Sequence, residues 1–149
     1  MINLKSGNLP EWYVAKYRRN IEVTKSKQSL HSKLIQELLA SDPKIQTVGF
    51  TKSLRDRFDE KECATVHLVP DAFKWVDEED EWPVVTAYEV EVHSVISHGS
   101  DRLKKYAWLW FYADCECIDL RLVLVSQFGH RSELDLQEQW YALGRHRSD

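Results

Sequence analysis

A short stretch of the chain, TAYEVEVHS (residues 86–94), alternates polar and apolar side chains. Its polar members with chemical potential are Glu89, Glu91 and His93. Successive side chains of a β-strand point to opposite faces, so these three would share one face. Carboxylates on such a face can ligate hard cations, and an imidazole can exchange a proton near neutral pH. The spacing therefore predicts a strand with one face that could do acid–base or metal chemistry.

Another carboxylate, Asp71, follows Pro70 in the preceding extended segment. We expect that segment and the strand containing Glu89 to pair. Neighbouring strands lie about 4.8 Å apart, so carboxylates on the same face of both would repel unless protonated, solvated or bridged by a cation. Oxygen ligands favour Mg²⁺ or Mn²⁺ over zinc. A metal ion there would lower the pKa of a bound water and neutralise phosphoryl charge, which predicts phosphodiester hydrolysis.

A simpler interpretation of the same residues requires no ligand. In it, Glu89, Glu91 and His93 form the hydrated face of an amphipathic strand, and Asp71 merely ends the neighbouring strand. Glu37 is then a solvent-side helix residue.

The elements that must position these residues can be predicted from periodicity and from capping residues. In chain order we predict helices over 10–23 and 26–42, strands over 44–50, 62–76 and 84–96, a helix over 97–114, a strand over 117–129 and a helix over 132–146. The second and third strands should form an antiparallel hairpin, and the crossover through residues 99–113 should make the last strand parallel to its predecessor. This order predicts an α/β (α+β) fold with a mixed sheet of about four strands flanked by helices.

The composition supports a folded chain. Of 149 residues, 43% are hydrophobic and 11% aromatic, which argues against disorder and suits a single domain. No apolar run is long enough to span a membrane, and the first residues lack the pattern of a secretory signal, so we expect no membrane association and a cytoplasmic location. The three cysteines form no CxxC pair and suggest no disulfide framework.

Charge is unevenly distributed along the chain. Residues 1–57 carry 11 Lys and Arg against 5 Asp and Glu, a balance of +6, which leaves 9 of the 20 basic and 19 of the 24 acidic residues, a balance of −10, for residues 58–149. A basic segment can follow a phosphate backbone while acidic groups elsewhere hold metal ions, although a solvated basic helix face also explains such a bias.

The pattern of Pro70–Asp71, then 17 residues, then Glu89–Glu91, within the element order αβββαβ, resembles the core of the PD-(D/E)XK nuclease superfamily. The resemblance covers residues 29–126 as a nuclease-like core, between a helical extension over 1–28 and a carboxyl-terminal helix within 127–149. It implies that Asp71 and Glu89 bind a catalytic Mg²⁺ or Mn²⁺.

The resemblance also implies roles for neighbouring groups. The carbonyl of Val90 would be a further metal ligand, and Glu37 stands where many members carry an additional acid. The basic side of the helix after the third strand, including Arg102, Lys104 and Lys105, would face the substrate.

The chain departs from the family at one position, because the superfamily's lysine falls at Glu91. Lys104 could supply the missing charge, and His93 could act as an acid or base. The sequence thus predicts a metal-dependent nuclease or nuclease-like DNA-processing protein. The alternative is a catalytically inactive protein of the same fold that binds DNA or a protein partner, such as a phage or mobile-element accessory protein. Because nucleases that cut both strands often work as dimers, a homodimer is compatible with the first hypothesis.

Overall fold

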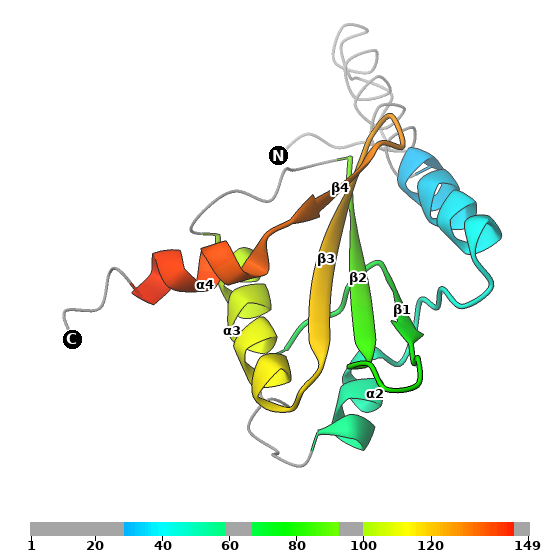
Figure 1. Ribbon diagram of the computed structural model, residues 1–149. Helices are drawn as coiled ribbons and strands as arrows, with labels where there is room; N and C mark the ends of the chain where they lie inside the picture. The colour runs from blue at the N-terminus through cyan, green and yellow to red at the C-terminus, as the bar shows by residue number, and fades with distance from the viewer. Residues whose placement is uncertain (1–28, 59–66, 93–99, 145–149) are drawn as a thin grey trace, which may run out of the picture.

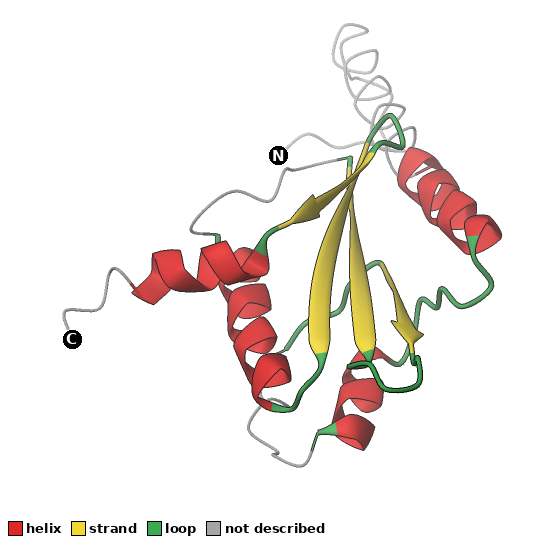
Figure 2. Cartoon of the chain, in the orientation of Figure 1, coloured by secondary structure: helices red, strands yellow, loops and turns green. Residues whose placement is uncertain are grey.

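The computed structural model of the chain describes residues 29–58, 67–92 and 100–144 (Figure 1). In chain order, its elements are a helix over 29–41, α2 (Phe50–Arg57), β1 (Ala72–Val76), β2 (Val84–Glu91), α3 (Asp101–Cys115), β3 (Asp119–Ser126), β4 (Arg131–Leu134) and α4 (Leu136–Gly144). The predicted class is confirmed, since helices flank a four-stranded mixed sheet (Figure 2). The predicted helix over 10–23 lies outside the described residues. No helix among those described is long and apolar enough to cross a membrane.

The strands follow the order β1-β2-β3-β4 across the sheet. β1 and β2 pair antiparallel, with Ala72 opposite Tyr88, which confirms the predicted hairpin. β2 and β3 pair in parallel, and α3 connects them along the chain, which confirms the predicted crossover. β3 and β4 pair antiparallel.

Helices cover both faces of this sheet (Figure 1). Leu34 and Leu38, one turn apart on helix 29–41, pack with Tyr88 and Val90 against one face. On the other face, buried residues of α2, α3 and α4 join strand residues such as Phe73 and Ala87 in the larger core. β2 is therefore buried on both faces over most of its length.

Two of the predicted strands, 44–50 and 62–76, differ from the structure. The stretch 44–50 forms no strand: Gln46 makes an isolated antiparallel bridge with Phe73, with two hydrogen bonds of 2.8 Å. Gly49 then adopts a φ of 90°, a conformation that glycine tolerates, and α2 begins. Phe50 is buried in the core as a result. In the segment 62–76, the strand begins only at Ala72, and residues 67–71 are not in a strand.

The helix predicted over 132–146 begins later than expected. Residues 131–134 instead form β4, because the chain reverses at Gly129, whose φ is 81°. Asp135 then caps α4 by accepting a hydrogen bond from the backbone N–H of Glu138 at 3.1 Å. The carboxyl-terminal part of the chain thus contributes an edge strand as well as a helix.

α3 forms where its capping residue and spacing predicted it. The Ser100 hydroxyl accepts a hydrogen bond from the backbone N–H of Leu103 at 3.2 Å, which caps the helix. Leu103, Tyr106 and Ala107 then follow at i, i+3 and i+4 and are fully buried. This face of α3 lies over β2 and β3 and determines what surrounds Glu89.

Candidate functional site

Glu89 is buried beneath α3. Only 7% of the residue is exposed, so the hydrated face considered as the simpler interpretation is wrong for this residue. Its Oε1 accepts a hydrogen bond from the Tyr106 hydroxyl at 2.6 Å and one from Arg102 Nε at 2.9 Å. Arg102 Nη2 donates to the same oxygen and also to the backbone carbonyl of Val69, at 2.7 Å. Two side chains one turn apart on α3 therefore hold one carboxylate oxygen.

Burial is the largest influence on the acidity of this group. It raises the pKa of Glu89, although the hydrogen bonds from Arg102 and Tyr106 act in the opposite direction. Burial works to lower the pKa of Arg102, but the hydrogen bond and charge of Glu89 raise it, so the guanidinium stays charged. Burial and the neighbouring carboxylate hold the pKa of Tyr106 well above its usual value. Tyr106 is therefore a neutral donor to Glu89.

Asp71 lies beside this group, immediately before β1. Its Oδ2 accepts a hydrogen bond from the backbone N–H of Val90 at 2.7 Å, and its own N–H donates to the Tyr88 carbonyl at 3.0 Å. The charge of Asp71 contributes to raising the pKa of Glu89, as expected for two neighbouring carboxylates. His31, from helix 29–41, places its Nε2 3.3 Å from Asp71 Oδ1.

The structure thus brings together three of the residues predicted to form a metal site: Asp71, Glu89 and the backbone of Val90. Glu91 is half-buried at the end of β2. His93 lies outside the described residues.

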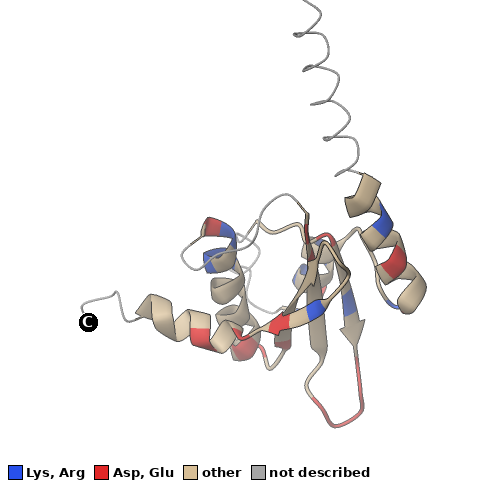
Figure 3. Cartoon of the chain, turned by 90° about the horizontal axis from the view of Figure 1, so that it is seen from above, with Lys and Arg blue, Asp and Glu red and all other residues tan. Residues whose placement is uncertain are grey.

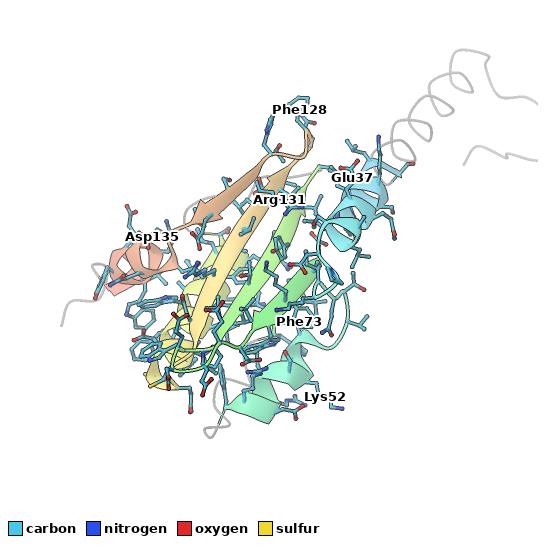
Figure 4. The ribbon with its side chains drawn as sticks, turned by 45° about the vertical axis from the view of Figure 1, so that its right-hand side comes forward. Glu37, Lys52, Phe73, Phe128, Arg131 and Asp135 are labelled. Carbon is cyan, nitrogen blue, oxygen red and sulfur yellow. The ribbon has the colours of Figure 1, made fainter. Side chains whose placement is uncertain are left out.

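Two other predicted residues lie apart from this group. Glu37 is exposed on helix 29–41, and no hydrogen bond or ion pair joins it to Asp71 (Figure 4). Lys104 is exposed on α3, and the cation that pairs with Glu89 is Arg102.

Sequence reasoning assigned Arg102 to the substrate side of the helix and missed Tyr106 and His31 as partners of the acids. A signal for Tyr106 was present, because Arg102 and Tyr106 are four residues apart and so share one face of α3. No comparable signal identifies His31, since its contact with Asp71 depends on how helix 29–41 packs on the sheet.

The acids are compatible with a hard divalent ion. In the part of the chain that the structure describes, no three His, Cys, Asp or Glu side chains are arranged to hold a metal. Mg²⁺, however, is usually bound by one or two carboxylates together with water and substrate phosphate. Asp71 and Glu89 satisfy that smaller requirement, and only one oxygen of Glu89 is engaged by α3.

Comparisons of the chain with protein-family models, with curated proteins and with solved structures found no match.

Proposed function

We propose that the protein is a Mg²⁺- or Mn²⁺-dependent phosphodiesterase that acts on DNA. The observation that carries the proposal is the meeting of Asp71, Val90 and Glu89 at one end of the β1–β2 hairpin, beside the guanidinium of Arg102. The order of a helix, an antiparallel bridge, two antiparallel strands, a helix and a parallel strand also agrees with the core that the sequence resembles, with α2 inserted after the bridge.

Each side chain has a role in this proposal. Asp71 and Glu89 would hold the ion, which supplies Lewis-acid activation of water and neutralises phosphoryl charge. Arg102 would donate to phosphate oxygens, since a guanidinium presents several N–H groups in a planar fork. It provides a positive charge near the position where the resembling family has a lysine and this chain has Glu91.

Tyr106 and His31 act through the acids. The Tyr106 hydroxyl fixes Glu89 from inside the core, where Tyr106 is completely buried. His31 holds the other side of Asp71. Both would therefore be positioning residues.

A second candidate is a non-catalytic protein of the same fold that binds DNA or a protein partner. The observation that favours it is the ion pair itself: Arg102 supplies positive charge at Glu89 that a metal would otherwise supply. Glu91, in place of a lysine, adds to this argument.

A cleavage assay separates the two candidates. Linear duplex, single-stranded and branched DNA would be incubated with the full chain and Mg²⁺, Mn²⁺ or EDTA. The proposal predicts products that require the divalent ion and disappear in Asp71→Asn and Glu89→Gln. Asp56→Asn, a matched change at an exposed position of α2, should cleave like the unmodified chain.

Ion binding is measured separately by thermal shift with Mg²⁺ and Mn²⁺. If the chain cleaves no DNA and shows no shift, the catalytic proposal fails. DNA binding that weakens steeply with salt, without cleavage, would instead support the second candidate.

A further inference from the structure

A pocket of about 320 Å³ lies between the turn that joins β1 to β2 and the adjacent sheet face. The turn connects the end of β1 to the start of β2, whereas Asp71 precedes β1 and Glu89 lies near the end of β2. The pocket therefore lies at the other end of the hairpin from these two acids. Its sheet side includes Thr86, which alternation places on the opposite face from Glu89. The pocket is therefore separate from the proposed phosphodiesterase site.

Thr86 forms part of the pocket wall and is only 7% exposed. The Thr86 hydroxyl makes no hydrogen bond to any group in the described residues. Every fully buried polar side-chain atom in those residues has a hydrogen-bond partner. The hydroxyl must therefore open onto the pocket, from which a ligand can reach it. A ligand that donates to this hydroxyl would form a hydrogen bond at a residue that is otherwise mostly buried, which would contribute to its affinity.

The basic groups of the pocket are already paired. Lys74 and Arg121 lie on either side of Thr86 in the sheet register. Lys74 Nζ is 3.1 Å from Asp42 Oδ2, and Arg121 Nη2 is 2.9 Å from Asp119 Oδ2. Their charges are therefore largely neutralised by neighbouring carboxylates, and they are poorly placed to attract an anion.

The acidic groups of the pocket have no such partners. Glu78 and Glu81 both border it, and no ion pair within residues 29–58, 67–92 and 100–144 includes either. The turn holds them together, since the N–H of Glu81 donates to the Glu78 carbonyl at 3.3 Å. A hydrogen bond between the two carboxyl groups and the charge of Glu78 raise the pKa of Glu81. Figure 3 shows the red acidic residues of this turn. The unmatched charge of the pocket is thus negative.

Trp82 completes the wall and is 49% exposed. An indole face next to carboxylates attracts cations through its ring quadrupole. The same combination occurs elsewhere on this hairpin, among the residues that the structure describes. Arg57 lies 3.8 Å from the ring centre of Trp75, and Asp77 accepts two hydrogen bonds from its guanidinium, at 2.7 and 2.9 Å.

We propose that the pocket bounded by Glu78, Glu81, Trp82 and Thr86 binds a guanidinium group, supplied by free arginine or by an arginine side chain of a partner protein. The guanidinium stacks on Trp82 and donates to the two carboxylates. Thr86 Oγ accepts a further hydrogen bond. A guanidinium has five N–H donors in one plane and can satisfy these acceptors together, whereas an ammonium cannot stack in the same way.

Calorimetric titration of the full chain tests this proposal with two arginine probes. One probe is arginine amide, and the other is a glycine-rich hexapeptide with a single central arginine. Citrulline versions, which are neutral and nearly isosteric, are the matched controls. Binding of both arginine probes supports recognition of the free group, and binding of the peptide alone supports a protein source. Failure of both, or equal binding of the citrulline versions, overturns the proposal.

Variants locate the binding site. The double change Glu78→Gln/Glu81→Gln, and separately Trp82→Leu, should each weaken arginine binding by about tenfold or more. Thr86→Val preserves shape, removes the unpaired hydroxyl and should weaken binding severalfold without loss of folding. Asp56→Asn, on α2, should leave the affinity unchanged. Unchanged affinity in the glutamine double variant and in Thr86→Val would also overturn the proposal.

Discussion

At the scale of single residues, the candidate site has a rigid side and an accessible side. Tyr106 is completely buried, and its hydroxyl holds Glu89 from within the core. The Arg102 side chain is 42% exposed, although it bonds to the same oxygen. Because an exposed side chain can rotate without unpacking the core, the proposed function would have Arg102 leave Glu89 for a phosphate while Tyr106 keeps the carboxylate in place. In the proposed function, Tyr106 would stabilise the fold around Glu89 and Arg102 would contact the substrate.

The rigid side can be tested by removing one hydroxyl. Tyr106→Phe leaves the ring in the core but removes a donor to a buried carboxylate, so we expect a loss of about 1 to 2 kcal/mol in the free energy of unfolding. Urea denaturation would measure it. Tyr112→Phe is a matched control on the same helix, where the tyrosine contacts neighbouring rings, and it should cost clearly less. Equal losses in the two variants would contradict the role assigned to Tyr106.

The pKa of Glu89 predicts a dependence of stability on pH. Burial raises it above the ordinary value of 4.5. A carboxyl group whose pKa is raised by folding contributes stability that is fully present below the unfolded pKa and is lost as pH rises through the folded pKa. The unmodified chain should therefore lose stability relative to Glu89→Gln as pH rises above 4.5. Urea denaturation of both proteins between about pH 4 and pH 7 measures this difference, and a relative gain for the unmodified chain would show that pairing outweighs burial.

At the scale of elements, α2 shows how an unpredicted helix is attached to the sheet. Arg57, at its end, pairs with Asp77 and lies over the Trp75 ring, and Trp75 Nε1 donates to Ser53 Oγ at 2.9 Å. Phe50 and Leu54 precede Arg57 by seven and three residues, so they share its side of the helix, and both are buried in the core. These contacts connect α2 to β1 and to the turn that follows it.

The contribution of Arg57 should depend on its planar group. Arg57→Lys preserves the charge but loses the paired hydrogen bonds and the stacking on Trp75, so we expect a loss of about 1 kcal/mol in stability. Arg55→Lys, two residues earlier and exposed, is the matched control and should change stability very little. Thermal and urea unfolding would measure both. If the two variants are equally stable, the contact between α2 and β1 contributes less than the geometry indicates.

The elements that the sequence predicted well carry strong local signals. Alternation and helical periodicity predicted the β1–β2 hairpin, α3 and the parallel strand β3. α2 and β4 were missed because they are short, with 8 and 4 residues, and depend on reversals at Gly49 and Gly129. A local sequence pattern predicts such short elements poorly.

The candidate site, like the fold, could be predicted from the sequence only in part. Strand pairing predicted Asp71 beside the strand that contains Glu89, and in the structure Asp71 Oδ2 accepts a hydrogen bond from the N–H of the next residue, Val90. Alternation shows which side chains share a face, but it does not show what covers that face. The burial of Glu89 beneath Arg102 and Tyr106 depends on the packing of α3 across the sheet, which only the three-dimensional structure provides.

At the scale of the whole molecule, the excess of basic charge near the start of the chain can be divided further. Residues 1–28 hold 6 Lys and Arg against 2 Asp and Glu, a balance of +4, and residues 29–57 hold 5 against 3, a balance of +2. Arg57, in the second group, is already paired with Asp77. If the protein binds DNA as proposed, the basic charge available to a phosphate backbone is therefore concentrated in the first 28 residues.

The salt dependence of DNA binding tests this distribution of charge. Each phosphate contact contributes about 0.9 to the slope of log affinity against log salt on duplex DNA. If Lys25 and Lys27 contact phosphates, Lys25→Gln/Lys27→Gln should make the slope shallower by up to about 1.8. Lys52→Gln/Arg55→Gln removes the same charge from α2, where Lys52 is exposed, and should leave the slope nearly unchanged (Figure 4). Fluorescence anisotropy with a labelled duplex at several salt concentrations gives both slopes. Equal reductions in the two slopes would mean that DNA affinity depends on the net charge of the chain rather than on the basic residues of 1–28.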